Sequence, residues 1–377
     1  MSIPFIDLAA QQKRLRSQID AAIDAVLASG QYILGPEVGE FEGKLAEFAH
    51  SRHALGCANG TDALLLPLMA WGVGEGDAVF CPSFTYCATA EVVALAGAVP
   101  VFVDIDRRTY NMDAGSLRRA VRGVLDGGQL VPRAVITVDL FGQSADYDAI
   151  APVAQEFGLR LIADSAQGFG STLDGKHPNA WADCQTTSFF PAKPLGCYGD
   201  GGAVLTDDAE LDGVMRSLHF HGRGGDRYDN VRIGLNSRLD TMQAAILLQK
   251  LSVFESEIEA RDRIAARYTA GLEGYVTRTP VIKEGVRPTW AQYTVEVPDP
   301  EGFAEYMKAA GVPTARYYPR PIHLQTAYKD FPVGAGGLPN TEDCMGHVIS
   351  LPMHPYLEKG VQDHIIQSAQ EASARSR

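Results

Sequence analysis

Between residues 54 and 206, short apolar segments alternate with longer segments of helical periodicity, and this alternation restricts the possible folds more than any other feature of the sequence. The apolar segments predicted as strands are 54–57, 78–81, 99–104, 134–139, 160–163 and 202–206. The segments between them predicted as helices are 61–71, 88–96 and 147–157. Strands that alternate with helices require crossover connections, which place parallel strands side by side with helices on both faces. The sequence therefore predicts an α/β fold built on a largely parallel sheet.

The pattern changes after about residue 240 and predicts a second, smaller α+β domain. A long helix is expected first, and the further elements expected are a strand at 292–297, a helix at 302–310 and a strand with its loop at 348–354. We place the large domain at residues 1–250 and the small domain at 251–377, with the N-terminal segment able to pack on the small domain. Outside these elements, an amphipathic helix is predicted at 16–28, a turn-rich segment at 31–48 and a frayed tail at 371–377.

The charge balance argues against a nucleic acid or an anionic membrane as the partner. Lys and Arg total 33 against 46 Asp and Glu, and the sequence contains no block of basic residues. No apolar run reaches the roughly 18 residues of a transmembrane helix, and the first residues lack the features of a signal peptide. The six cysteines form no CxxC pair, which predicts reduced thiols and no zinc site. Together these features predict a cytoplasmic protein without a metal.

Polar residues follow the predicted strands, where the ligands of open α/β sheets bind. Asn59, Gly60 and Thr61 follow the first strand and begin a helix, whose N-terminal N–H groups can bind a phosphate. The same residues are equally compatible with an ordinary helix cap. Tyr86 follows the second strand and is placed to stack on a flat ring, although most single aromatic residues belong to the core.

Asp164 and Lys193 are the two charged residues whose positions in the sequence most need an explanation. Asp164 follows the strand at 160–163, where a buried carboxylate needs a cationic partner or several donors, and a helix cap is the competing interpretation. Lys193 is flanked by Pro191 and Pro194, which stiffen its backbone, and by glycines that permit tight turns. A lysine held and partly desolvated in this way is suited to covalent bonding with a carbonyl group, whereas most lysines simply reach the surface.

Sequence motifs of several other cofactor and catalytic sites are absent. There is no GxGxxG at the start of a helix, no P-loop, no HExxH and no GxSxG. His219 and His221 have no further metal ligands near them in the sequence. The missing glycine motif disfavours a nicotinamide enzyme in particular.

The order of the segments is more specific than any one of them. The chain contains GTDA, PSFTYCATA, DSAQGFG, SFFPAKPLG and LNSRLD in that order, and over nearly its whole length it resembles the nucleotide-sugar aminotransferases of the DegT/DnrJ/EryC1/StrS family. These enzymes have fold type I of the pyridoxal-phosphate enzymes. The resemblance implies a mostly parallel seven-stranded sheet in the large domain, pyridoxal 5'-phosphate as the cofactor, and amino transfer as the reaction.

The resemblance also implies a role for each matching residue. Lys193 would be the catalytic residue, which bonds to the cofactor and moves the proton, and Asp164 would pair with the pyridine nitrogen. The other residues implied to bind the cofactor are Gly60, Thr61 and Ser188 at the phosphate, Gln167 at the ring hydroxyl, Tyr86 and Ala166 on the ring faces, and Asn236 at the phosphate of the neighbouring subunit. This last role implies a homodimer with shared active sites. Ser165 departs from the family pattern, in which alanine is commoner.

Several phrases, among them QYILGPEV, CANGTDAL and NSRLDTMQAAILL, are similar to family members that aminate UDP-2-acetamido-2-deoxy-3-oxo-glucuronate in bacterial surface-polysaccharide synthesis. Pro194 after the lysine agrees with that subgroup. The implied reaction takes the amino group from L-glutamate, releases 2-oxoglutarate and aminates the 3-keto group of the nucleotide sugar. The residues expected to bind the substrate are Arg238, Arg316, Tyr318, Arg320 and His323.

Three alternatives remain open on the sequence. The substrate could be another UDP- or dTDP-linked sugar with a 3-keto or 4-keto group. The chain could be a sugar dehydratase of the same fold, although such family members carry histidine at the position of Lys193. It could also be a non-enzymatic regulator descended from an aminotransferase, for which an appended DNA-binding domain would be evidence.

Overall fold

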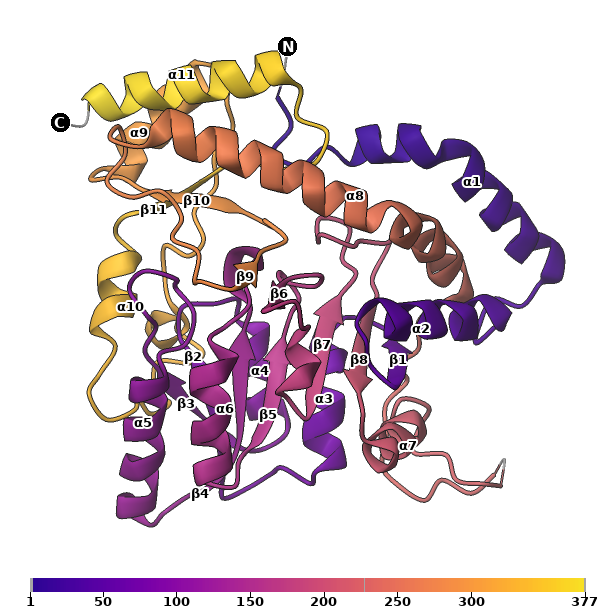
Figure 1. Cartoon of the computed structure of the whole chain (residues 1–377). Coiled ribbons are helices and arrows are strands. Elements are labelled where there is room, and N and C mark those ends of the chain that lie inside the picture. Colours follow the sequence, from indigo (N-terminus) through magenta and orange to yellow (C-terminus); the bar gives the residue numbers. More distant parts are fainter. Residues whose placement is uncertain (1–2, 227, 376–377) are drawn as a thin grey trace.

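A seven-stranded sheet forms the centre of the computed structural model, which describes residues 3–226 and 228–375 (Figure 1). The strands lie in the order β1-β8-β7-β5-β4-β2-β3. Their bounds are β1 (His53–Cys57), β2 (Asp77–Pro82), β3 (Val99–Val103), β4 (Val131–Val138), β5 (Arg160–Asp164), β7 (Cys184–Ser188) and β8 (Gly202–Thr206). Strand β8 runs antiparallel to both of its neighbours, whereas β2, β3, β4, β5 and β7 are parallel. The predicted α/β fold with a mostly parallel sheet is confirmed.

Successive residues of each strand point to opposite sides of the sheet, so both faces carry apolar side chains, and helices cover both faces. In β2, for example, Val79 and Cys81 belong to one hydrophobic core, and Ala78 and Phe80 belong to the other. The helices over the first core are α3 (Gly60–Ala70), α4 (Ala88–Leu95) and α7 (Ala209–Leu218), and those over the second are α5 (Ala114–Gly127) and α6 (Tyr147–Glu156). Since neither face meets solvent, most strands are continuous apolar runs in the sequence.

Residues 31–48 are mostly helical, so the prediction of a turn-rich segment there is wrong. The helix α2 (Pro36–Phe48) begins with a proline at its first turn, a position where proline is well tolerated. The residues of its buried face are Val38, Phe41, Leu45 and Ala46. Gly39 and Gly43, which suggested turns, lie on the exposed face. Glycine lowers helix stability there, but the packing of the opposite face outweighs that loss.

Both ends of the chain are more helical than predicted. Helix α1 (Leu8–Ser29) begins well before residue 16, because the side chain of Asp7 accepts a hydrogen bond from the N–H of Ala10 and caps the helix. Helix α11 (Lys359–Arg375) was not predicted, and it includes residues 371–375 of the predicted frayed tail, whose last two residues, 376–377, lie outside the described residues. Ala372 near its end is 1% exposed and belongs to the core of the small domain, so packing holds this turn in place.

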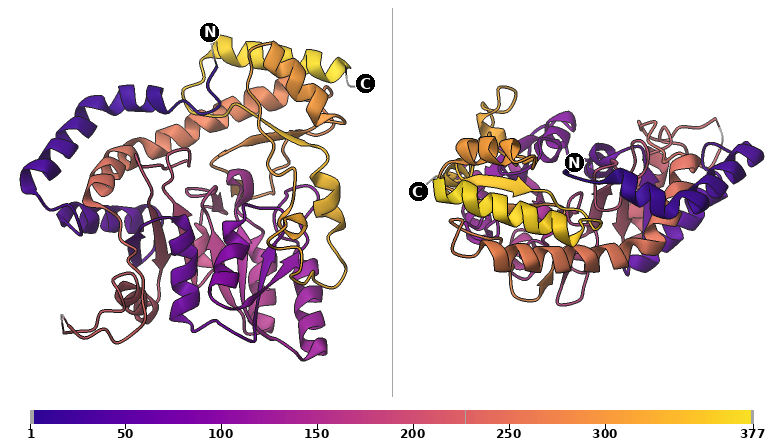
Figure 2. Two further views of the ribbon diagram at one scale, coloured as in Figure 1. Left: turned by 180° about the vertical axis from the view of Figure 1, so that it is seen from behind. Right: turned by 90° about the horizontal axis from the view of Figure 1, so that it is seen from above.

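The small domain lies around the far end of α8 (Thr241–Leu272), the long helix predicted from about residue 240 (Figure 2). The other elements of this half are β9 (Val286–Arg287), β10 (Tyr293–Glu296), α9 (Pro300–Ala309), η3 (Ile322–Leu324), α10 (Pro339–Cys344) and β11 (Val348–Leu351). Strands β10 and β11 pair antiparallel, and β9 pairs with β6 (Thr172–Leu173) of the large domain. The remaining short helices are η1 (Leu140–Gly142) and η2 (Pro178–Ala180).

The positions of the two chain termini and of the long helix α8 are relevant to the predicted division into a large and a small domain. Both termini lie at the small-domain end of the molecule in the two views of Figure 2. Ile3 packs against the small-domain core, and the N–H of Met353 donates to the carbonyl of Phe5 at 3.3 Å. A division between residues 250 and 251 falls inside α8, and it stays a prediction. None of the described helices is both long and apolar enough to cross a membrane.

His354 is a buried histidine whose protonation is expected to weaken the fold in mild acid. Neither ring nitrogen has a hydrogen-bond partner within the described part of the chain, and the side chain is 3% exposed. Burial lowers its pKa to about 4, and the charge of Asp7 opposes this only partly. The unfolded chain therefore binds this proton more readily, so the stabilisation is present above about pH 6.5 and is lost as the pH falls toward 4.

We expect His354→Leu to remove this pH dependence. Between pH 7.5 and pH 5.5, the free energy of unfolding should fall by about 1 kcal/mol less in the variant than in the wild type. Urea titrations at the two pH values measure the difference. His364→Leu, at an exposed position on α11, is the control and should behave like the wild type. Equal pH dependence in all three proteins would contradict the expectation.

Candidate active site

The predicted site segments meet at one edge of the sheet because of the register of β1, β8 and β7. Strands β2, β5 and β7 are parallel members of the sheet, so their carboxyl ends lie on the same edge. Cys57 at the end of β1 and Ser188 at the end of β7 both pair with Gly202 of β8. This places Gly60, at the start of α3, beside Ser188 although the two are far apart in the sequence.

Gly60 and Ser188 are in close contact at the N-terminus of α3. A Cβ atom added to Gly60 would lie 2.6 Å from the Cβ of Ser188. The side-chain oxygen of Asn59 accepts a hydrogen bond from the N–H of Asp62 at 2.8 Å and so caps the helix. The positive end of the helix, the hydroxyl groups of Thr61 and Ser188, and the missing side chain at Gly60 together suit a phosphate group.

Asp164 is a buried carboxylate at the end of β5 that accepts hydrogen bonds from neutral groups. Its Oδ2 accepts from the hydroxyl of Thr89 at 3.0 Å, and its Oδ1 accepts from the N–H of Ala166 at 3.1 Å. Burial raises the pKa of Asp164, and the Ala166 N–H, the charge of Lys193 and Thr89 oppose this rise. A carboxylate in this setting favours a further cationic partner.

Lys193 lies on the loop after β7, close enough to Asp164 for the two charges to interact. Burial lowers the pKa of Lys193, and the charge of Asp164 opposes that effect. The loop is tight, because the N–H of Lys193 donates to the carbonyl of Phe190 at 2.8 Å. A Cβ at Gly196 would lie 2.6 Å from the carbonyl oxygen of Pro191, so only glycine fits there. The structure thus holds a partly desolvated amine beside a buried carboxylate.

Gln167 and Tyr318, predicted from separate segments, contact each other. The Nε2 of Gln167 donates to the hydroxyl of Tyr318 at 3.0 Å, and its Oε1 accepts from the N–H of Phe141 at 3.0 Å. Burial raises the pKa of Tyr318, and the charge of Asp164 contributes to that rise. Tyr86 is 58% exposed, so its ring is open to a ligand.

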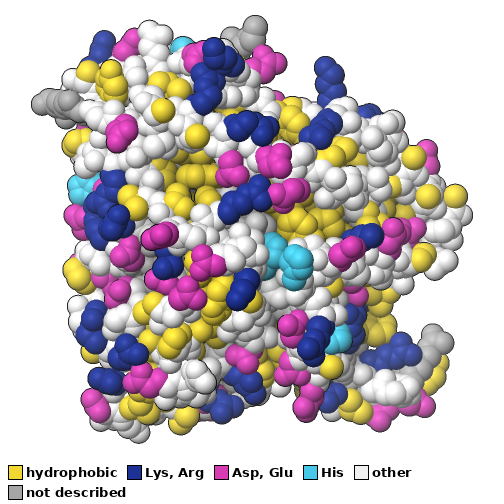
Figure 3. All heavy atoms as spheres, viewed as in Figure 1, with side chains coloured by type: hydrophobic (Ala, Val, Ile, Leu, Met, Phe, Trp, Pro, Cys, Tyr) yellow, Lys and Arg dark blue, Asp and Glu magenta, His cyan; other side chains and the backbone are white. Residues whose placement is uncertain are grey.

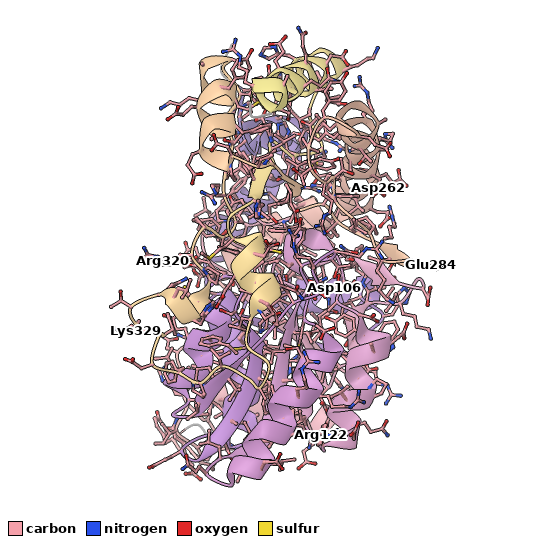
Figure 4. The ribbon with its side chains drawn as sticks, turned by 90° about the vertical axis from the view of Figure 1, so that its left-hand side faces the viewer. Asp106, Arg122, Asp262, Glu284, Arg320 and Lys329 are labelled. Carbon is pink, nitrogen blue, oxygen red and sulfur yellow. The ribbon has the colours of Figure 1, made fainter. Side chains whose placement is uncertain are left out.

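The surroundings of Arg316 and Arg320, two of the predicted substrate residues, differ. Arg316 pairs with the carboxylate of Glu301 and donates to the carbonyl of Met345 at 2.7 Å. Its charge is therefore already compensated within the small domain. Arg320 is exposed and projects from the same side of the molecule as Lys329 (Figure 4).

The surroundings of His323, Asn236 and Arg238 are also defined. His323 is buried, and its Nδ1 shares a hydrogen bond of 2.7 Å with the hydroxyl of Ser83. Asn236 is exposed on the segment between α7 and α8, and the guanidinium of Arg238 lies 4.9 Å from the centre of the Phe220 ring. The contacts described here are made within the chain itself and do not involve a ligand. The binding roles of these three residues therefore stay predictions.

Thr89 and Asp139 support the site and were not predicted from the sequence. Thr89 holds Asp164, but nothing in the sequence distinguishes it from any threonine in a helix. Asp139 follows β4 directly, and that position after an apolar strand was the one available signal. It accepts hydrogen bonds from the hydroxyl groups of Ser165 at 2.5 Å and Tyr147 at 2.7 Å, and burial raises its pKa to about 7. Ser165, the departure from the resembled pattern, therefore has a specific partner here.

The surface charges and the possible metal ligands are two further features of the molecule. Acidic and basic side chains are interspersed over the face seen in Figure 3. Within residues 3–226 and 228–375, no group of three or more His, Cys, Asp or Glu side chains is placed to hold a metal ion.

The fold and the comparisons with known proteins together define the class of this protein as an aminotransferase. Residues 13–370 match the model of the DegT/DnrJ/EryC1/StrS aminotransferase family. The chain belongs to this family, whose match covers almost its entire length.

Individual relatives agree with this assignment. The chain is 49% identical over 358 residues to the UDP-2-acetamido-2-deoxy-3-oxo-D-glucuronate aminotransferase of Pseudomonas aeruginosa, which covers 94% of this chain and 96% of that protein. The crystal structure of a DegT/DnrJ/EryC1/StrS aminotransferase from Brucella abortus is 52% identical, with a TM-score of 0.96, and covers 98% of this chain and 99% of that one. A third structure, NtdA from Bacillus subtilis with bound cofactor PMP, is 28% identical with a TM-score of 0.87 and covers 99% of this chain and 85% of that one.

Proposed function

We propose that this protein is a pyridoxal-phosphate-dependent aminotransferase that moves the amino group of L-glutamate to the 3-keto group of UDP-2-acetamido-2-deoxy-3-oxo-D-glucuronate. The product would be UDP-2-acetamido-3-amino-2,3-dideoxy-D-glucuronate, made in the cytoplasm for O-antigen or another bacterial surface polysaccharide. The observation that carries the chemistry is the buried carboxylate of Asp164, held by Thr89 and the N–H of Ala166 at the end of β5, with Lys193 on the loop that follows the neighbouring strand β7. The choice of sugar is supported by the similarity to the Pseudomonas aeruginosa enzyme.

The residues present fit pyridoxal phosphate. Asp164 would provide the buried negative charge that a protonated pyridine nitrogen needs, and Lys193 would provide the amine that holds the cofactor covalently. The missing side chain at Gly60 lets the N-terminus of α3 lie against Ser188, so the helix N–H groups and the Ser188 hydroxyl would be available to one phosphate. The other residues proposed to bind the cofactor are Thr61, Tyr86, Ala166, Gln167 and, across a dimer interface, Asn236.

The proposed roles follow from these positions. When bound, the cofactor supplies an electron sink for the electron pair released as a proton leaves the carbon that carries the amino group. Asp164 would maintain the positive charge of the ring nitrogen. Lys193 would take the proton from the α-carbon of glutamate and, in the second half of the reaction, deliver a proton to C3 of the sugar. Because burial lowers the pKa of Lys193, more of its amine is unprotonated at neutral pH, as a proton acceptor requires.

Gly60→Ala is expected to weaken pyridoxal-phosphate binding by about tenfold or more, because the added methyl group would overlap Ser188 and push apart the helix N-terminus and the serine that are proposed to hold the phosphate. Titration of the apoprotein with the cofactor, followed by absorbance, measures the change. Gly39→Ala is the control: nothing lies within 4 Å of its added Cβ. That variant should bind normally and gain about 0.5–1 kcal/mol of stability. Equal affinities for both variants would count against the phosphate position.

The proposed enzyme acts as a homodimer. The exposed large apolar side chains on segments that carry or adjoin predicted site residues are Tyr32, Ile33, Leu34, Tyr86, Phe190, Val231 and Ile233. Two of these segments are adjacent, because the N–H of Thr241 donates to the carbonyl of Tyr32 at 3.0 Å. The segment between α7 and α8, which carries Asn236, extends away from the body of the molecule in Figure 1. An apolar surface of this kind marks a protein interface.

Subunit mixing tests the shared site. Lys193→Ala and Asn236→Ala homodimers should each have little activity, and mixed dimers should recover one intact site if Asn236 acts on the neighbouring subunit. Failure to recover activity on mixing would place Asn236 in its own subunit's site. An active monomer in light scattering would refute the dimer.

The reaction itself is tested with purified, cofactor-loaded protein, glutamate and a panel of nucleotide sugars bearing 3-keto or 4-keto groups. We expect 2-oxoglutarate and an amino sugar to form in equal amounts, fastest with the UDP-linked 3-oxo-uronate. Sugar conversion without any amino donor would indicate a dehydratase instead. The absence of both turnover and a visible cofactor band would leave a regulator as the better description.

A further inference from the structure

Lys250 is a lysine buried in the middle of α8 with an unusual set of partners. It is 1% exposed. Its Nζ donates a hydrogen bond to the carbonyl of Gly196 at 2.6 Å and lies 4.1 Å from the centre of the Tyr198 ring. Among the ion pairs of the described residues, none involves Lys250. Burial of an ammonium without a carboxylate is costly, so packing alone does not account for a lysine here.

The partners of Lys250 belong to the loop that carries Lys193. Gly196 lies on the same tight turn, and the N–H of Cys197 donates to the carbonyl of Phe189 at 2.7 Å to close its base. Glycine is required at Gly196 because a side chain would meet the carbonyls of the preceding residues. The carbonyl of Gly196 accepts its hydrogen bond from Lys250, so the loop and the helix are joined at the point where the turn ends.

A second residue of α8 makes a matching contact. The Oε1 of Gln243 accepts a hydrogen bond from the N–H of Tyr198 at 2.8 Å. Gln243 and Lys250 lie about two helical turns apart, and therefore on one face of α8. The helix thus holds a carbonyl and an N–H on the carboxyl side of Lys193. Through this face the Lys193 loop is joined to α8, and α8 itself runs on into the small domain.

We infer that Lys250 is a positioning residue for Lys193: by holding the Gly196 carbonyl, it fixes the end of the loop and so the place to which the Lys193 amine returns beside Asp164 at the end of each catalytic cycle. This inference rests on the proposed function, in which Lys193 leaves and regains its bond to the cofactor. Burial lowers the pKa of Lys250 to about 8, with opposing effects from Cys197 and Glu257. The hydrogen bond does not depend on that charge, because a neutral amine also donates to a carbonyl.

Lys250→Met tests the inference, since methionine has a similar length but no donor. In the cofactor-loaded protein without substrate, the visible band of Lys193-bound cofactor should weaken or shift its pH midpoint by about half a unit or more. We expect kcat to fall by about 10- to 100-fold with KM changed less than about threefold, because a small misplacement of a reacting group has effects of this size. Lys250→Arg, which keeps a donor, should restore most of the band and of kcat.

Arg261→Met is the matched control. Arg261 is another buried cation of α8, 7% exposed, but its charged neighbours are Glu257 and Tyr356 and not the Lys193 loop. This variant should lower the melting temperature while the band and its pH midpoint stay unchanged. A Lys250→Met protein that melts lower but keeps the wild-type band and kcat would show a merely structural role and overturn the inference.

Two further measurements keep the outcomes separate. If Lys250→Met does not fold, Gln243→Leu removes the neighbouring contact with Tyr198 and should shift the band in the same direction; an unchanged band in that variant would overturn the inference. A wild-type protein that shows no band when loaded with pyridoxal phosphate would refute the proposed function itself.

Discussion

Lys193→Ala is expected to lower kcat for amino transfer by about 10⁴-fold or more and to remove the absorbance band of the lysine-bound cofactor. Alanine can neither bond to the cofactor nor carry the proton, so both functions proposed for one side chain are lost together. The neighbouring Asp164 and the contact between Gly60 and Ser188 remain, so the cofactor should still bind without the covalent bond.

Single-turnover assays with glutamate and spectra of the loaded variant measure the two losses separately. Lys193→Arg keeps a positive charge beside Asp164 but should be equally inactive, which distinguishes the chemistry of the amine from its charge. Lys44→Ala is the control at an exposed lysine paired with Glu47, and it should match the wild type. Substantial turnover by Lys193→Ala would refute the catalytic assignment.

Glu296→Gln is expected to destabilise the protein by about 3–5 kcal/mol, because it breaks a buried ion cluster and leaves cations uncompensated. The carboxylate of Glu296, at the end of β10, is 1% exposed. It accepts hydrogen bonds from Arg107, which contacts both of its oxygens, and from the hydroxyl of Tyr110 at 2.6 Å. Arg278 completes the cluster, with its Nη2 3.2 Å from the carboxylate.

The location of this cluster makes its loss global. Arg107 and Tyr110 follow β3 of the large domain, whereas Glu296 belongs to the small domain, so the cluster joins the two. Urea unfolding at neutral pH measures the change. Asp343→Asn is the matched control: Asp343 pairs with the same Arg107, but its side chain is 52% exposed, and its loss should lower stability by less than about 1 kcal/mol. Similar losses in the two variants would contradict the importance of burial.

Most strands of the sheet could be predicted from the sequence because their residues are apolar on both faces. Residues 202–206 were predicted with the bounds that β8 has in the structure. Strand β7 was not identified, because its sequence CQTTS contains polar residues. Its side chains are nonetheless buried: the Nε2 of Gln185 donates to the hydroxyl of Ser165 at 3.0 Å, and the hydroxyl of Thr186 donates to the carbonyl of Ala163 at 3.4 Å. Such compensation depends on residues that are distant in the sequence.

The candidate site divides in the same way. Asp164 was predicted because it follows a strand, where ligands of open α/β sheets bind, and Lys193 was predicted because prolines and glycines constrain the backbone around it. Arg316 as a substrate contact stays a prediction, and its carboxylate partner Glu301 was known only from the tertiary structure. Lys250 was not predicted as a site residue, because a lysine in a helical pattern is normally exposed. Only the tertiary structure shows that it is buried against Gly196.

The sequence by itself determined the α/β fold, the order of the site segments and the two charged residues at their centre. These features follow from burial pattern and backbone stiffness, which are properties of short stretches of chain. Only the tertiary structure decided that Gly60 meets Ser188, that Asp139 supports Ser165 and that Lys250 holds the Lys193 loop. Each of these contacts depends on strand register or helix packing between distant segments, and the choice of such a partner is not encoded in any local pattern.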